Sequence, residues 1–113
     1  MNYRYLFKGK EKYSEKWLGW NAIAGIPHNV SILSDTICQC TGLKDKNGKL
    51  IWENDVVQYC DYTVENYVIA WEADKACFEY QQYGCSIMNF DELSGIEIEV
   101  IGNIFDNPEL RNE

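Results

Sequence analysis

Apolar and polar positions alternate with a period of two in several short stretches of this chain, which is the pattern of β-strands. Residues 96–100 show it most cleanly, with apolar side chains facing one side and two glutamates the other. The stretch 67–71 also fits a helix by pattern alone, but its β-branched pair and two aromatic rings favour a strand. Further strands are expected in residues 3–8, 16–20, 55–60, 76–83 and 85–90.

Turn-forming residues separate these stretches and join some of them into hairpins. The charged segment 9–15 links two expected strands into an N-terminal hairpin. Asn47-Gly48 is a strong hairpin signal, because both residue types reach positive φ at low cost. Near the end of the chain Asn107 precedes Pro108, which is typical of the start of a short helical turn. Seven or eight short strands with little helix predict an all-β barrel or sandwich.

Length and composition agree with one folded unit, a single domain spanning residues 1–113. Hydrophobic residues make up 46% and aromatic residues 14%, which excludes a disordered tail and favours half-buried, pleated surfaces. Residues 21–35, which Pro27 and two serines interrupt, predict a loop with one short strand.

Charge is distributed unevenly along the chain, whose net charge is −8. Residues 1–49 hold 8 basic and 4 acidic residues, whereas residues 50–113 hold 2 basic and 14 acidic residues. Such an acidic half would repel duplex nucleic acid and anionic membranes. Solubility alone is one explanation of the charge. A protein partner with a basic surface is the other, more specific one.

The five cysteines predict reduced thiols rather than a metal site or a disulfide framework. Cys38 and Cys40 are one residue apart, which is not a metal-binding spacing, and His28 is the only histidine. The first residues lack the apolar core of a secretory signal, and no apolar run is long enough to span a membrane. We therefore expect a protein of the cytoplasm, with no cofactor, no bound metal and no catalytic residues.

Two kinds of residue could carry a function. Asp45 and Asp55 could act as an acid–base pair, but carboxylates in turns usually accept backbone hydrogen bonds, and we favour that role. The tryptophans most simply fill a core, with one or two partly exposed, although exposed rings could also form a peptide groove or stack nucleobases. The candidate interaction surface comprises Trp17, Trp20, Trp52, Glu97 and Glu99.

Three blocks of the chain resemble the YopX-like family of phage and prophage proteins. The first block is Tyr5-Leu6-Phe7-Lys8-Gly9-Lys10 followed by Trp17-Leu18-Gly19-Trp20. The second runs from Cys40 to Val57 and contains Thr-Gly-Leu-Lys-Asp-Lys-Asn-Gly-Lys, and the third, Glu-Val-Ile-Gly-Asn-Ile-Phe-Asp-Asn-Pro-Glu-Leu, covers residues 99–110. The family usually has glycine at the position of Asn54, and asparagine is the commonest other residue with a left-handed backbone, so a turn is expected there.

The resemblance implies an SH3-like β-barrel core, to which the expected N-terminal hairpin would be an extension. It also implies an origin in phage or prophage DNA, and so a bacterial host cell, and no known enzyme activity. The motif residues expected to shape the backbone are Gly42, Asp45, Asn47, Gly48, Asn54, Asp55, Gly102, Asn103, Asn107 and Pro108.

Two functions remain open on the sequence. The first is an accessory factor that binds a host or phage protein, for example as an inhibitor of a host defence system. The second is a protein that binds and sequesters a small molecule or a nucleotide. The sequence leaves the oligomeric state open, self-association included.

Overall fold

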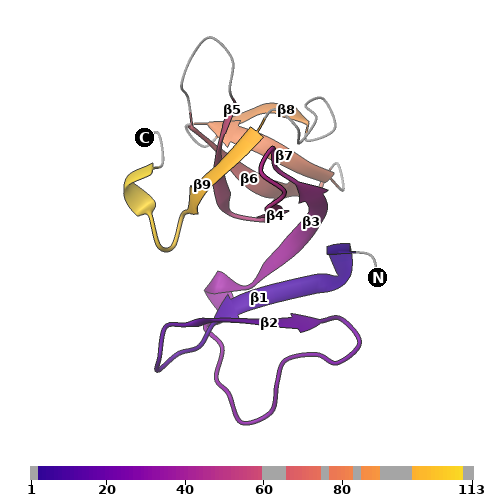
Figure 1. The fold of residues 1–113 in the computed structure, drawn as a ribbon, viewed down its shortest axis with the longest axis vertical. Helices are drawn as coiled ribbons and strands as arrows, with labels where there is room; N and C mark the ends of the chain where they lie inside the picture. Colours follow the sequence, from indigo (N-terminus) through magenta and orange to yellow (C-terminus); the bar gives the residue numbers. More distant parts are fainter. Residues whose placement is uncertain (1–2, 60–65, 75–76, 83–84, 90–97, 111–113) are drawn as a thin grey trace.

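The computed structural model describes residues 3–59, 66–74, 77–82, 85–89 and 98–110 (Figure 1). These residues form nine strands in two antiparallel sheets, one with the order β2-β1-β3-β4 and the other with the order β8-β7-β6-β5-β9. The strands are β1 Leu6–Lys10, β2 Trp17–Asn21, β3 Cys38–Lys44, β4 Leu50–Trp52, β5 Asp55–Tyr59, β6 Asn66–Glu72, β7 Cys77–Gln82, β8 Cys85–Asn89 and β9 Ile98–Asn103. Three 3-10 helices, η1 Tyr3–Tyr5, η2 Ser34–Thr36 and η5 Pro108–Leu110, are the helices of these ranges.

The first sheet begins with the predicted N-terminal hairpin, which is confirmed. β1 and β2 pair from Leu6 opposite Asn21 to Lys10 opposite Trp17. β3 then lies on the other side of β1 and continues into the β3–β4 hairpin, which reaches the second sheet (Figure 1). Of the expected loop at residues 21–35, Asn21 ends β2 and residues 34–35 belong to η2, while the rest is a loop. The short strand predicted within it is only an isolated bridge between Glu11 and Ile32.

The main hydrophobic core lies against the second sheet. Its buried members are Ile51, Val57, Ile69, Phe78, Tyr80 and Ile98, with Tyr67 and Val100 packed against them. Because Ile51 belongs to β4 of the first sheet, the two sheets share this core. The strand predicted at residues 67–71 lies within β6, at the centre of the second sheet.

The predicted all-β class with very little helix is confirmed, but the two sheets are not closed into a barrel. The reason lies at β9, the edge of the second sheet. Its outer side meets the turn after β3, where Lys46 N–H donates to the Ile98 carbonyl (2.9 Å) and Val100 N–H donates to Asp45 Oδ2 (2.9 Å). A turn of the first sheet therefore occupies the edge that a closing strand would need.

The predicted turns form with local differences from the expectation. At the β3–β4 hairpin Gly48 has a positive φ of 82°, while Asn47 does not share this conformation, so glycine alone meets the backbone demand. The left-handed conformation expected at Asn54 is confirmed, with φ 70°. Asn54 also anchors the turn, because its backbone N–H donates to the Ile69 carbonyl (2.7 Å) and its own carbonyl accepts the Ile104 N–H (3.1 Å).

The closing motif folds back onto β9 as a compact hook. The Asn103 side chain accepts N–H groups from Phe105 (3.0 Å) and Asp106 (2.9 Å), while Asn107 Oδ1 accepts from Asn103 N–H (3.3 Å). The Asn107 side chain lies directly over Gly102, where an added Cβ would also come within 2.9 Å of a Leu110 methyl carbon. The spacing of this motif is thus explained by packing onto a residue without a side chain.

Substitutions at Asn54 test the turn. Asn54→Gly is expected to leave the free energy of unfolding unchanged or slightly higher, because glycine adopts positive φ freely. Asn54→Val is expected to lower it by about 1–2 kcal/mol, since a β-branched residue is strained there. Urea unfolding measures both, and equal midpoints for the two variants would contradict the argument.

Substitutions of two strand glycines test the hook. Gly102→Ala is expected to lower the free energy of unfolding by about 1–3 kcal/mol through overpacking against Asn107 and Leu110. Gly19→Ala is the matched control, because a Cβ there would meet only the Phe7 carbonyl oxygen at 3.5 Å, an ordinary contact. Thermal unfolding of both variants checks the pair, and an equal loss at the two positions would show that the hook is not responsible.

Candidate functional site

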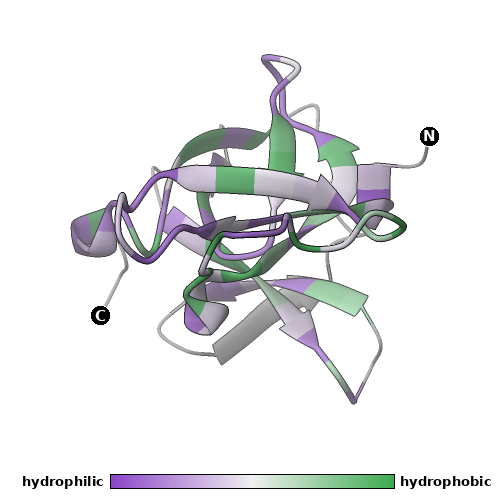
Figure 2. Cartoon of the chain, turned by 90° about the horizontal axis from the view of Figure 1, so that it is seen from below, coloured by the Kyte–Doolittle hydropathy of each residue, from purple (hydrophilic) through white to green (hydrophobic). Residues whose placement is uncertain are grey.

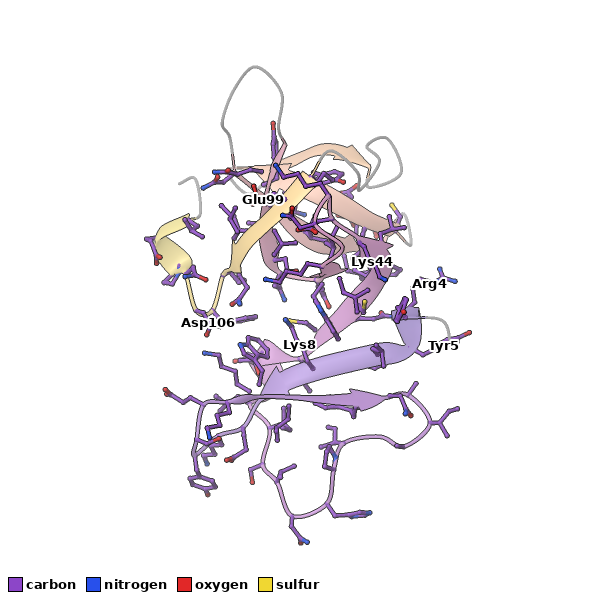
Figure 3. All side chains as sticks on the ribbon, in the orientation of Figure 1. Arg4, Tyr5, Lys8, Lys44, Glu99 and Asp106 are labelled. Atoms are coloured by element: carbon purple, nitrogen blue, oxygen red, sulfur yellow. The ribbon has the colours of Figure 1, made fainter. Side chains whose placement is uncertain are left out.

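A cluster of lysines and tryptophans lies where the first sheet meets the closing hook (Figure 3). Lys8 Nζ, from β1, lies 4.7 Å from the ring centre of Trp17 and 4.8 Å from that of Trp52. Lys10, two residues further along β1, forms an ion pair with Asp106 and lies 5.6 Å from the Trp17 ring. We call these five residues the lysine–tryptophan cluster.

Asp106 is the acidic centre of this cluster. Trp17 Nε1 donates to its Oδ2 at 2.8 Å, and Asn103 Nδ2 donates to the same oxygen at 3.2 Å. Partial burial would raise the pKa of Asp106, but the hydrogen bonds from Lys10, Trp17 and Asn103 outweigh it and lower the pKa to about 2. Asp106 is therefore ionised at neutral pH and holds its partners through charge-assisted hydrogen bonds.

The cluster has the composition of a cation-binding aromatic site, yet the cation is the chain's own Lys8. Two indole faces around one ammonium group satisfy the geometry of cation–π contacts. The arrangement connects β1, β2 and β4 with the loop after β9 and positions them relative to one another. The cluster therefore has a structural role, since it joins two parts of the fold. An external cation or nucleobase would have to displace Lys8 before it could bind the rings.

The structure brings only two of the sequence-predicted surface residues together, Trp17 and Trp52. Trp20 lies on the opposite face of the hairpin, near Gly9, where an added Cβ would stand 3.2 Å from its ring and 2.6 Å from Ile32. Glu99 lies apart from the tryptophans and contacts Lys46 (3.5 Å) and the Asn47 amide (3.5 Å) instead. Glu97 lies outside the described residues.

The expectation that the tryptophans fill the core is wrong. The buried core contains none of the four, and three of them, Trp17, Trp20 and Trp52, are half-buried. Trp71, near the end of β6, is 47% exposed, with its ring edge-on to Phe78 at 5.1 Å between ring centres. Glu72 and the exposed Asp74 follow it, so this end of β6 is aromatic and acidic. We call Trp71, Glu72 and Asp74 the β6 surface.

Some charges of the basic and acidic halves pair with each other or are buried in the fold. Both ion pairs found among the described residues, Lys10–Asp106 and Lys46–Glu99, join a lysine of the basic half to an acid of the other half. Two further acids of that half, Asp55 and Glu79, are buried. The acidic face expected from the sequence is accordingly smaller than the count of carboxylates suggested.

The carboxylates of the central motif serve the backbone, as predicted. Asp45 is 5% exposed and accepts N–H groups from Asn47 and Lys49 (both 2.9 Å) in addition to that of Val100. Desolvation would raise its pKa, but these three bonds lower it below the usual value. Asp55 is 3% exposed and accepts the N–H of Trp52 at 2.8 Å. Here desolvation dominates over the hydrogen bond from Trp52 and the charges of Lys8 and Lys49, and raises the pKa to about 6.

The thiols and the histidine show no assembled site. Cys38 and Cys40 are buried and unpaired, and burial raises the pKa of both, that of Cys38 to about 11, so they are poor nucleophiles. His28 is exposed in the loop after β2. No three histidine, cysteine or acidic side chains gather as metal ligands within the described ranges, which exclude Cys60.

Sequence reasoning missed the lysines and Asp106 of the cluster. The signal was partly present, since the hairpin register places Lys10 opposite Trp17 and Lys8 two positions along the same face. The contribution of Asp106 could not be inferred from the sequence, because Asp106 is 89 residues away from Trp17 in the chain.

The fold and these surfaces define a small all-β protein of two antiparallel sheets, with motif carboxylates that act on the backbone. The family model described as YopX protein matches residues 2–111, and the chain belongs to this family. The crystal structure of protein EF1440 from Enterococcus faecalis is similar to it, with a TM-score of 0.58 and 26% sequence identity, over 92% of this chain and 95% of that one. No curated protein matches the chain. The helices of the described ranges are each three residues long, too short to cross a bilayer.

The pH dependence of stability tests the assignment of Asp55. Its pKa is higher in the folded chain than in the unfolded chain, so the folded state binds more protons between about pH 4 and pH 6. The contribution of Asp55 to stability therefore falls as pH rises through this window. Relative to wild type, Asp55→Asn is expected to gain about 2–3 kcal/mol in the free energy of unfolding between pH 4 and pH 7.

Asp45→Asn is the matched control for this measurement. The pKa of Asp45 is lowered in the folded chain, so its stabilisation is present above the ordinary pKa and is lost as pH falls. The free energy of unfolding of Asp45→Asn should therefore fall further below that of wild type as pH rises from 3 to 7. This change with pH is opposite in sign to the change expected for Asp55→Asn. Urea titrations at several pH values check both, and parallel curves for the two variants would refute the assignments.

Proposed function

We propose that this protein is a phage- or prophage-encoded accessory factor that acts by binding another protein through a basic surface on that partner. The observation that carries the proposal is the exposure of Trp71 beside Glu72 and Asp74. Membership of the YopX family supports an accessory role but names no activity.

The β6 surface has the composition of a binding hot spot. Tryptophan is strongly enriched among residues whose truncation weakens protein complexes, and a ring 47% exposed leaves apolar area for a partner to cover. The edge-on contact with Phe78 holds the ring in one orientation, so little side-chain freedom is lost on binding. Trp71 would thus provide affinity for a partner's apolar pocket.

The negative charges of Glu72 and Asp74 favour a partner whose surface is positively charged. Individual exposed charges add little affinity, but an acidic surface raises the association rate with a basic protein. A basic protein of this kind includes one whose own task is to bind nucleic acid, and interference with such a host protein would suit an inhibitor of host defence. The acidic half would at the same time disfavour direct contact with duplex DNA.

A second candidate function rests on the lysine–tryptophan cluster. Two indole faces beside a lysine could stack a nucleobase and pair with its phosphate. Because Lys8 already lies over both rings, such a ligand must displace it, and we rank this nucleotide-binding function second.

Affinity capture from phage-infected host cells tests the first function. Wild-type protein is expected to retain a specific partner, Trp71→Ala to weaken the purified complex by about tenfold or more, and Asp74→Lys together with added salt to slow association. Tyr13→Ala is the matched control, because Tyr13 is an exposed aromatic (80%) in the β1–β2 turn of the other sheet. A complex indifferent to Trp71 and to salt, or tight binding of duplex DNA by the isolated protein, would refute the proposal.

A further inference from the structure

The outer edge of β2 carries backbone groups that point away from the sheet. Glu11 N–H donates to the Lys16 carbonyl and Ala22 N–H donates to the Tyr5 carbonyl, both at 2.9 Å, just beyond the two ends of the β1–β2 ladder. In an antiparallel ladder, hydrogen-bonded pairs alternate with pairs that are not bonded. The register between these ends therefore points the backbone N–H and C=O groups of Leu18 and Trp20 toward β1. The N–H and C=O groups of the residues between and beside them, Trp17, Gly19 and Asn21, point outward.

No described segment covers this edge. β2 is the last strand in the order β2-β1-β3-β4, and the loop segment around Ile32 pairs with β1 on its other side. Among the described residues, no hydrogen bond reaches the outward groups of Trp17 or Gly19, while the Asn21 carbonyl accepts Gly25 N–H at 2.9 Å. The edge is open over most of its length.

β2 also lacks the features that usually protect an exposed edge. Natural edge strands carry lysine, proline or a bulge that prevents pairing with another strand. Residues 17–21 contain none of the three, and Figure 2 shows strongly hydrophilic colour only at the C-terminal end of this strand, which crosses the front of the view. At the centre Gly19 is exposed and leaves space on its face of the sheet.

We infer that this edge binds a second copy of the chain, with the two β2 strands paired antiparallel about a two-fold axis at Gly19. In this register Gly19 faces Gly19, Leu18 of one copy faces Trp20 of the other, and Trp17 faces Asn21. The N–H and C=O groups of Gly19 then meet those of Gly19 in the other copy, and the Asn21 N–H meets the Trp17 carbonyl, while the Asn21 carbonyl keeps its bond to Gly25. The two first sheets become one continuous sheet.

The strand is complementary to itself in shape and in charge. Leu18 and Trp20 are half-buried in one copy, and the cross-strand contacts cover more of their apolar surface. Along β2 the nearest charged residue is Lys16, which would face Ala22, so the two Lys16 side chains are six strand positions, or roughly 20 Å, apart. Lys8, which lies opposite Gly19 on the neighbouring strand, would be three strand spacings, or roughly 14 Å, from Lys8 of the other copy. Both distances exceed the screening length of about 10 Å at 0.1 M salt. The acidic second sheets stay apart, because each joins the first sheet at β4, the edge opposite β2.

Gly19→Glu provides the decisive variant. It places two carboxylates directly opposite each other at the axis. Within one copy its Cβ meets only the Phe7 carbonyl oxygen at 3.5 Å, and its carboxylate lies opposite Lys8, a residue of opposite charge, so the single chain should fold normally. Sedimentation from about 10 μM to about 1 mM is expected to show a monomer–dimer equilibrium for wild type. It should show a monomer for Gly19→Glu and an unchanged dimer for Gly19→Ala.

Ser34→Glu is the control for the added charge, because Ser34 is exposed in η2 and follows the segment that pairs with β1 on the side away from β2. It should leave the dimer unchanged. Hydrogen exchange at the amides of Trp17 and Gly19 should slow as the wild-type dimer forms, a readout that another mode of association would not produce. A wild-type monomer at all concentrations, a dimer that survives Gly19→Glu, or loss of the dimer in Ser34→Glu would each overturn the inference. None of these results bears on the β6 surface, which lies on the other sheet.

Discussion

One buried carboxylate, that of Asp45, ties the two halves of this chain together. It accepts two N–H groups within the β3–β4 turn and a third from Val100 on β9, so a single side chain both shapes the hairpin and attaches it to the second sheet. Hydrogen bonds to a charged group contribute about 1.5–3 kcal/mol each, more than neutral ones. The position of β4, the delivery of Ile51 into the shared core and the coverage of the β9 edge all depend on this attachment.

The charge asymmetry of the sequence has a structural role before any functional one. Lysines of the first half pair with Glu99 and Asp106 of the second, and Lys8 lies between two indole rings at the same junction. Exposed ion pairs contribute little individually, so their main effect is to orient the sheets that the core and Asp45 hold together. Among the described residues, Glu72 and Asp74 of the β6 surface remain for a partner to contact.

Backbone geometry explains the motifs that mark the family. Asp45 supplies a turn, Asn54 holds a left-handed position, and Gly102 accommodates the side chain of Asn107. The central and closing motifs therefore report how the chain folds rather than what it binds. Of the two surfaces that we connect with association, the β6 surface lies outside all three family blocks, whereas the β2 edge falls in the first block.

The sequence by itself determined the local structure of this protein. Period-two alternation predicted the strands, Asn47-Gly48 predicted a hairpin, and the asparagine at position 54 predicted a left-handed turn, because each depends on the conformational preferences of a few adjacent residues. The resemblance to known proteins correctly predicted the family. It also predicted a closed barrel, which the structure does not form. Only the tertiary structure decided which tryptophans are exposed, which lysine meets Asp106, and that a turn rather than a strand covers β9. These contacts join residues far apart in the chain: Asp45 and Val100 are 55 positions apart, and Lys10 and Asp106 are 96 positions apart. Local preference contains no information about such pairings, because they follow from the packing of two sheets around one core.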